Sequence, residues 1–413
     1  MSNAIKSISI EGYKSIRKMD IELRPLNVLI GANGAGKSNF VSFFRLLHEM
    51  VEQRLQLAVN SEGGADAILH FGPKVTKRLD AILRFALTVY QFSLAPTVDN
   101  RLIFKSESVG QRSGGADPNH PVREGAPQLL GTGQTESLLK ERRNEPSSTN
   151  FDVLATNYHA YWGVYQIISS NTCIYHFHDT SSTAGMRRQG PINDNEFLRQ
   201  DAENLAAFLF MLKKTEPMVY QNIRDAVRLA APFFDDFKLR PVTANPELIQ
   251  LEWTQIGSDY PFRPSQLSDG TLRFICLATA LLQPKPPATM LFDEPELGLH
   301  PYALTLLASL FKQAAKSGGL VILCTQSAAL LNEFEPEDVI VVDRQDGQST
   351  FRRLDRANLS EWLENYGLGE LWQKNIFGGR PHGDAQNSPP ESGKPENSSP
   401  FTPDSAHPEG EKP

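Results

Sequence analysis

Apolar residues near the N-terminus first alternate with polar ones and then recur at helical spacing. Residues 4–10 and 20–23 alternate, as half-buried strands do. The run 25–30 is apolar apart from Asn27, as in a buried strand of a mixed sheet. From Phe40 to Met50, phenylalanine, leucine and methionine recur three or four positions apart. These patterns predict a strand, a glycine-rich loop and a helix in that order.

The middle of the chain predicts an insertion between two halves of one core. Residues 78–104 are rich in Leu, Ile, Phe, Val and Tyr and predict strands, whereas 106–150 are polar and predict a long, partly mobile loop. Further patterns predict a strand over 167–177, helices over 196–212 and 220–229, and a strand over 248–253. We therefore expect an α/β fold with a mixed β-sheet core, formed by residues 1–105 and 246–380, around an inserted α+β lobe at about 106–245. The sequence shows no internal repeat.

The loop between the first buried strand and the first helix has the composition of a phosphate-binding loop. It fits the pattern G-x-x-x-x-G-K-[ST] without a mismatch. Glycines let backbone N–H groups approach phosphate oxygens, and the helix that follows turns its positive end toward them. Lys37 would reach the β- and γ-phosphates, and Ser38 would offer its hydroxyl to Mg²⁺. The candidate ATP-binding residues are Gly31, Ala32, Asn33, Gly34, Ala35, Gly36, Lys37, Ser38 and Asn39.

A second apolar strand, 289–294, ends in two acidic residues. Asp293 is placed to hold Mg²⁺, and Glu294 is placed to orient or deprotonate the attacking water. Such a pair can also be an ordinary acidic turn. Together with a phosphate loop, it predicts the hydrolytic half of a nucleotide site.

A short motif at 267–271 predicts a second anion-binding helix end. Ser268 stands where an N-cap is expected, Gly270 permits close backbone approach, and apolar residues recur at helical spacing from Phe274 onward. A helix cap without a ligand is the simpler interpretation. The motif lies 25 residues before Asp293.

These motifs in this order resemble the ATPase heads of the RecF, OLD and SMC branch of ABC-type, AAA-domain proteins. Residues 267–271 resemble the ABC signature, and Glu294 with the residues to Pro301 resembles the catalytic glutamate running into the D-loop. The segments 64–72 and 368–381 resemble those of RecF-like ATPases in particular. The resemblance covers about residues 4–381.

The resemblance implies a pair of heads that enclose two ATP molecules with Mg²⁺. Ser268 and Gly270 of one copy would contact the γ-phosphate held by residues 31–38 of the other. ATP then joins the two copies, and hydrolysis through Glu294 lets them separate. This arrangement implies an ATP-dependent homodimer.

Several positions depart from the family pattern or stay open. Gln326 stands where the family carries a switch histidine, and since Gln cannot carry a proton charge, we expect a slow ATPase. Gln53 and Gln56 are the candidates for the Mg²⁺-sensing Q-loop glutamine, with structural roles equally open. Lys14 and Ser15 lie either near the nucleotide or in an exposed turn.

Two further groups of side chains allow more than one interpretation. His176 and His178 would share one strand face, which suits a metal, but no other residue nearby has ligand spacing, so partly exposed polar residues are favoured. The basic pairs could touch a phosphate backbone, although solvated surface is the favoured interpretation. These pairs are Arg142–Arg143, Arg187–Arg188 and Lys213–Lys214.

Composition limits the class of protein. The net charge is −7 over 413 residues, and residues 381–413 contribute −4 of it in a proline-rich stretch that we expect to be disordered. Such a balance argues against coating nucleic acid by charge alone, but leaves room for a local DNA-binding patch. No stretch is apolar enough for a membrane span, no secretory signal is visible, and three dispersed cysteines fit a reducing compartment. We expect a cytoplasmic protein.

Three functions compete at this stage. The first is a DNA-associated ATPase that acts as a switch in DNA repair or maintenance. The second is the ATPase, or sensor, subunit of a defence or toxin-like module whose effector protein is supplied in trans, and the third is an ATP-dependent scaffold that does not hydrolyse. A transporter cassette is disfavoured because 256 residues separate Lys37 from Asp293. A long coiled-coil arm is disfavoured because residues 78–260 mix strands with short helices.

Overall fold

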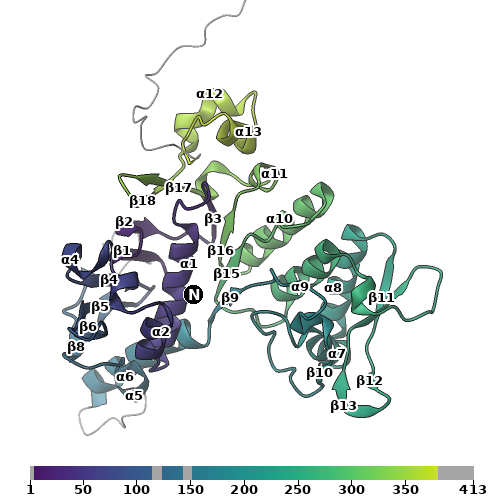
Figure 1. The fold of residues 1–413 in the computed structure, drawn as a ribbon, viewed down its shortest axis with the longest axis horizontal. Helices are drawn as coiled ribbons and strands as arrows, with labels where there is room; N and C mark the ends of the chain where they lie inside the picture. Colours follow the sequence, from purple (N-terminus) through teal and green to yellow (C-terminus); the bar gives the residue numbers. More distant parts are fainter. Residues whose placement is uncertain (1–3, 114–122, 143–150, 380–413) are drawn as a thin grey trace, which may run out of the picture. The chain divides into compact units, whose positions relative to one another are not determined.

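A mostly parallel sheet lies at the centre of the computed structural model, which describes residues 4–113, 123–142 and 151–379 (Figure 1). Five strands run parallel, and the edge strand β18 pairs antiparallel with β17. In spatial order the strands are β18 (Gln348–Arg353), β17 (Val339–Gln345), β3 (Leu26–Ile30), β16 (Leu320–Thr325), β15 (Thr289–Asp293) and β9 (Thr172–Tyr175).

The central strands are apolar along their whole length because both faces of this sheet are covered. Leu29 of β3 and Leu291 of β15 belong to one hydrophobic cluster, whereas Val28 and Met290, one position earlier on each strand, belong to another. Successive residues therefore point into two separate cores.

The first core is closed by helix α1 (Lys37–Val51) and an antiparallel sheet. Phe40, Phe43 and Phe44 of α1 are fully buried between the two sheets. In the described part of the chain this second sheet has seven strands, with the order β2-β1-β4-β5-β6-β7 and β8 paired to β6. Their bounds are β1 (Ser7–Tyr13), β2 (Ile16–Glu22), β4 (Leu79–Arg84), β5 (Thr88–Pro96), β6 (Leu102–Ser113), β7 (Arg123–Glu124) and β8 (Gln128–Gly131). The helices around it are α2 (Leu55–Ser61), α3 (Ala65–Ile68), α4 (Gly72–Val75), α5 (Leu139–Arg142) and α6 (Phe151–Ser169).

Four longer helices form the second core against the other face of the central sheet. α8 packs on α9, and both contact α10 (Figure 1). These helices are α7 (Leu205–Thr215), α8 (Pro217–Ala230), α9 (Asp269–Leu282) and α10 (Pro301–Lys316). Two small sheets accompany them, made of β10 (Gly190–Pro191), β12 (Pro241–Val242) and β13 (Asn245–Ile249), and of β11 (Phe234–Lys238) and β14 (Glu252–Gln255). The C-terminal helices are α11 (Ala328–Leu331), α12 (Ser360–Leu363) and α13 (Leu368–Gln373).

The predicted core elements are present, and the segments of the predicted inserted lobe belong to more than one sheet. Residues 106–113 continue β6, and 128–131 form β8, so the expected long loop is partly sheet. The expected strand over 167–177 is the end of α6 followed by the four-residue β9. β9 pairs with β15 and thus belongs to the central sheet, whereas α8, further along the predicted lobe, packs with α9 and α10.

Three other expectations have different outcomes. The helix expected over 196–212 begins only at Leu205, after a stretch held by turns. Cys276 and Cys324 are buried and Cys173 is half-buried, all as free thiols, as expected. The tail at 381–413 lies outside the described residues. Among the helices that are described, none has the length and apolar character that crossing a membrane requires.

A buried carboxyl group ties β6 to the neighbouring segments of the antiparallel sheet. Glu107 is fully buried and accepts hydrogen bonds from Tyr90 Oη at 2.7 Å, Ser137 Oγ at 2.5 Å and the Leu138 amide at 2.9 Å. Burial raises the pKa of Glu107. Gln134 Nε2 donates to it as well, at 3.1 Å, so replacing this acceptor would leave four donors without their partner.

We predict that Glu107→Ala destabilises the protein by at least about 2 kcal/mol, because each unsatisfied buried donor costs roughly 1–3 kcal/mol. Glu107→Gln retains one acceptor oxygen and should lose less. Thermal melting monitored by tryptophan fluorescence checks both variants. Equal melting temperatures for wild type and Glu107→Ala would contradict the assigned network.

Candidate functional site

The carboxyl ends of four parallel strands bring the predicted site residues together. Ile30 of β3 is paired with Thr325 of β16, and Asp293 of β15 is paired with Cys324. The phosphate loop follows β3 and therefore begins beside Gln326, which follows β16. Gln326 in turn lies next to Asp293 and Glu294, at the end of β15. Ligands of open α/β sheets bind at this edge.

The phosphate loop has the backbone conformation that its glycines allow. Gly34 and Gly36 have φ angles of +79° and +118°, a region that disfavours other residues. No side chain caps the first turn of α1, so its backbone N–H groups remain available to an anion. Lys37 Nζ donates to the carbonyl oxygens of Gly31 at 2.5 Å and Ala32 at 3.0 Å.

Three polar side chains brace this loop from outside the motif. Ser349 on β18 is buried; its hydroxyl donates to Ala35 O at 2.5 Å and accepts from Ser15 Oγ at 2.7 Å. Asn39 Nδ2 donates to Ser15 Oγ at 2.6 Å. A side chain at Gly36 would collide with Ser349, so glycine is required there by this brace as well as by its φ angle. The role of Ser349 could not be predicted from the sequence, because this residue lies more than 300 positions from the loop.

The charged groups of the two motifs face each other. Lys37 is 5% exposed, and burial lowers its pKa, an effect that Cys324, Glu294 and Asp293 oppose. Burial raises the pKa of Asp293, and among its neighbours His178 opposes this most. The lysine and the two acids thus share one partly buried space.

Glu294 is held in an unusual backbone conformation at the end of β15. Its φ angle is +43°, and its amide donates to Cys324 O at 2.8 Å. Gln326 Nε2 donates to Glu294 Oε1. The structure therefore places Gln326, the predicted switch residue, directly on the predicted catalytic carboxylate.

Glu296 is a further acidic residue that sequence analysis did not single out. Its Oε1 accepts from Thr325 Oγ1 at 2.6 Å and from the Gln326 amide at 3.0 Å. Its Oε2 is buried without a partner among the described atoms, and burial raises its pKa. Glu296 fixes the segment that carries Gln326.

The donor set suits Mg²⁺ held together with a nucleotide. Ser38 is exposed at the start of α1, and Asp293 supplies a carboxylate. Mg²⁺ is usually bound by one or two such oxygens, with phosphates and water completing the octahedron. Among the described residues no cluster of three His, Cys, Asp or Glu side chains could hold a metal without a nucleotide.

The signature segment presents an exposed helix end on a buried foundation. Ser268 caps α9, and its Oγ accepts from the Thr271 amide at 3.1 Å. Gly270 is buried against the carbonyl group of Gly298 in the D-loop, and a side chain there would collide with it. Packing within the chain therefore explains why glycine is required at position 270. The contact of Gly270 with ATP stays a prediction.

Two buried arginines hold this segment, and sequence analysis had assigned neither to the site. Arg187, expected on the solvated surface, is 8% exposed and donates to Asp269 Oδ1 at 2.7 Å and to Pro264 O. That expectation is wrong because the backbone carbonyls around the signature need buried donors. Arg273 donates to Phe177 O at 2.9 Å, to His178 O at 3.2 Å and to Leu297 O. Burial lowers the pKa of Arg273.

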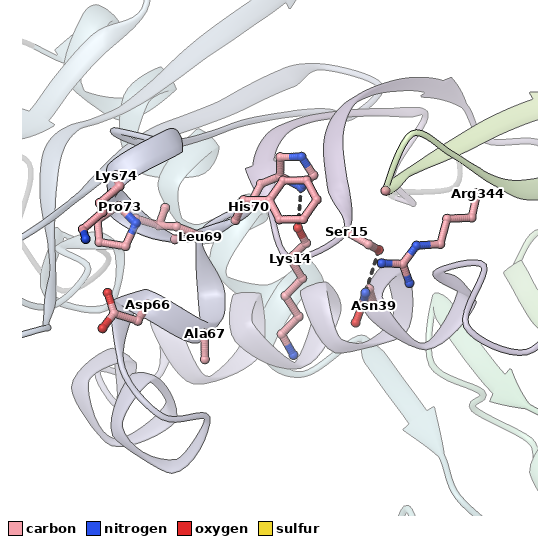
Figure 2. Close-up of a pocket in the computed structure, with 13 residues that line it drawn as sticks. Lys14, Ser15, Asn39, Asp66, Ala67, Leu69, His70, Pro73, Lys74 and Arg344 are labelled. Carbon is pink, nitrogen blue, oxygen red and sulfur yellow. Dashed lines mark hydrogen bonds between the residues drawn. The ribbon is translucent and has the colours of Figure 1, made fainter. Parts of the chain in front are cut away.

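A pocket of about 660 Å³ opens beside the phosphate loop (Figure 2). Ser15 and Asn39 line one side of it, and Arg344 donates to Gly34 O at 3.2 Å. Residues 66–74, which include most of the segment resembling RecF-like ATPases, line the other side, where His70 Nδ1 lies 2.6 Å from Lys14 O. Lys14 itself binds Glu62 at 2.9 Å, so its ammonium group is already paired.

The two candidate Q-loop glutamines lie elsewhere. Gln53 Nε2 donates to Glu141 Oε1 at 2.9 Å, and Gln56 Nε2 donates to the carbonyl oxygens of Leu102 and Thr135, both at 2.8 Å. Gln53, just before α2, thus bonds to α5. Gln56, on α2, bonds to the start of β6 and to Thr135. The structure thus assigns them a structural role.

His176 and His178 follow β9 directly, beside Asp293. The ring of His176 contacts Arg45 Nη2 on α1, and burial, with Arg45 and His178, lowers the pKa of His176 to about 4. The two rings lie 6.3 Å apart, and His178 is exposed.

A family model and solved structures match this chain. The model described as "AAA domain, putative AbiEii toxin, Type IV TA system" matches residues 26–332. No curated protein matches the chain in sequence.

Solved structures of SMC heads resemble this chain. An SMC head bound to the C-winged helix domain of ScpA is 16% identical, covers 87% of this chain and 99% of its own, and has a TM-score of 0.51. An Smc head domain with an extended coiled coil from Pyrococcus furiosus, bound to the C-terminal domain of ScpA, is also 16% identical. It covers 87% and 98% of the two chains, with a TM-score of 0.46. The first likeness confirms the expected fold, the head of an ABC-type P-loop ATPase.

We predict that Ser349→Ala weakens ATP binding about threefold to tenfold, because it removes one buried hydrogen bond to the phosphate loop. Titration calorimetry with ATP and Mg²⁺ measures the affinity. Thr350→Ala, on the next residue of β18, is the matched control and should bind as wild type does, since among the described residues its hydroxyl bonds only to Asp343 O, at 3.5 Å. Unchanged affinity in Ser349→Ala would show that the brace does not support binding.

Proposed function

This chain belongs to the AAA-domain family whose model spans residues 26–332, and we propose that it is an ATPase whose two copies close around ATP and Mg²⁺. The phosphate loop of one copy and the signature helix of the other would enclose each nucleotide. The observation that supports this most is that one chain carries two helix N-termini suited to phosphate. The N-terminus of α1 has no side-chain cap, and that of α9 carries the exposed Ser268.

The signature end is suited to meet a second copy. Ser268 is exposed, while Gly270 and Arg187 behind it are buried and fully engaged. An exposed serine hydroxyl at the N-terminus of α9, held on a buried and hydrogen-bonded base, presents a preorganised anion site. Since α1 already provides the anion site for the chain's own phosphate loop, the second site is available to a nucleotide bound by the partner copy.

Each catalytic group then has a defined task. Lys37 exchanges the carbonyls of Gly31 and Ala32 for phosphate oxygens when ATP binds. Ser38 and Asp293 would hold Mg²⁺, which neutralises charge on the phosphates. Glu294 orients the attacking water, and Gln326 positions Glu294 through their hydrogen bond. Because Gln326 carries no titrating proton, turnover is slow.

The pocket beside the phosphate loop accommodates the nucleoside. Its volume of about 660 Å³ is within the range of small-molecule sites, roughly 300–1,000 Å³. Asn39, which follows Ser38 immediately, lines this pocket, and Arg344 of its lining donates to Gly34 O in the phosphate loop. His70 and Phe71 supply an apolar and aromatic wall for a base.

We predict that Glu294→Gln protein shifts from monomer to dimer in light scattering when ATP and Mg²⁺ are added. Turnover should fall about 100-fold or more, since a general base is lost while ATP binding is retained. If Glu294→Gln hydrolyses ATP as fast as wild type, the scaffold alternative or another base is favoured.

Ser268→Arg in the same background should abolish the dimer, because the arginine fills the space of the γ-phosphate. Ser265→Arg, an equal substitution at another exposed position of the approach to α9, is the matched control and should still dimerise. A dimer that survives Ser268→Arg would contradict the assigned role of the signature.

The pathway has two candidates. The resemblance of the motifs to RecF-like ATPases supports a switch acting on DNA in repair or maintenance, and the family description supports the ATPase subunit of a defence or toxin-like module with an effector in trans. DNA binding predicts an ATP-dependent mobility shift of duplex or single-stranded DNA that weakens steeply with salt. Absence of any shift with the ATP-bound Glu294→Gln dimer would favour the module.

A further inference from the structure

The segment that follows β9 lies against the acidic end of β15. Tyr175 pairs with Phe292 in the parallel ladder, so the next residues of both strands leave the sheet side by side. On one side these residues are Asp293, which ends β15, and Glu294. On the other side they are His176 to His178, which follow the end of β9. Any group bound in front of Asp293 therefore also lies in front of this segment.

The two histidines of this segment have different surroundings. The imidazole of His176 contacts the guanidinium group of Arg45, and the backbone amide of His176 donates to Gln200 O at 2.8 Å. His178 is exposed and lines a small cavity together with Asp293, Glu294 and Arg273. The cavity measures about 10 Å³, which is close to the space of one water molecule.

The backbone of His178 is fixed independently of any ligand. Arg273, itself 7% exposed, donates to the carbonyl oxygens of both Phe177 and His178. Because this backbone is already fixed, only the torsions of the His178 side chain need to be ordered when the imidazole binds a ligand. Asp293 and Glu294 beside His178 only accept hydrogen bonds when they are ionised. An oxygen bound between them therefore needs a hydrogen-bond donor that neither carboxylate can supply.

We propose that His178 is a further positioning residue of this site, and that its imidazole hydrogen-bonds the water or phosphate oxygen carried by the ion at Ser38 and Asp293. This inference rests on the proposed function. The imidazole lies outside the ion's own ligand set and orients an oxygen within it, as outer groups do in other metal sites. Neither Gln53 nor Gln56 reaches this place, because both are bound near α5 and β6.

The test measures Mn²⁺ binding, by electron paramagnetic resonance, to the protein saturated with a non-hydrolysable ATP analogue. His178→Ala should weaken Mn²⁺ binding about tenfold, the lower end of the loss seen when outer partners are removed. His178→Gln, whose neutral amide can replace the hydrogen bond, should restore most of the affinity. Metal-free binding of the analogue should stay unchanged in both variants.

Asp179→Ala is the matched control, since Asp179 is the next residue, is exposed, and contacts only Ser181 among the described groups. Its Mn²⁺ affinity should equal that of wild type. Unchanged affinity in His178→Ala, or an equal loss in Asp179→Ala, would overturn the assignment. If wild-type protein fails to bind the analogue at all, the proposed function itself is wrong, and the two failures are thereby distinguished.

Discussion

The parallel pairing of β3, β16, β15 and β9 is the constraint on which the site depends. Because these strands run in one direction, the residues that follow each of them meet at a single edge. The phosphate loop, Gln326, Glu294 and His178 come from four distant parts of the chain and become neighbours only through this register. A shift of one residue in any strand would turn its core side chains to the wrong face and displace its catalytic group.

The same edge concentrates buried polar groups, and several of them bind partners from another segment. Ser349 supports the phosphate loop from β18, Glu296 fixes the backbone of Gln326, and Arg273 joins the segments after β9 and β15 to α9. Low local dielectric makes such bonds strong and their loss costly. The site is therefore preorganised before a nucleotide binds, except for Lys37, which is bound to its own loop.

Local motifs could be predicted from the sequence because their chemistry depends on neighbouring residues. The phosphate loop, the acidic pair at Asp293 and Glu294, and the cap at Ser268 each lie within a few positions. Ser349, Arg187 and Arg273 could not be assigned, because their partners are distant along the chain and an arginine pattern alone resembles solvated surface. The start of β9 could not be predicted, because the apolar end of α6 has the same composition as a buried strand. The four residues of β9 are too few for their periodicity to distinguish the strand from the helix before it.

The central claim is that each nucleotide lies between the phosphate loop of one copy and the signature of another. Cross-linking tests it most directly: Asn33→Cys protein is mixed with Ser268→Cys protein, both carrying Glu294→Gln, and treated with a short bismaleimide. Parent protein without the added thiols controls for Cys173, which is half-buried. We predict a cross-linked heterodimer that forms with ATP and Mg²⁺ and is absent without them. A cross-link independent of ATP, or none under conditions where light scattering shows a dimer, would contradict the composite site.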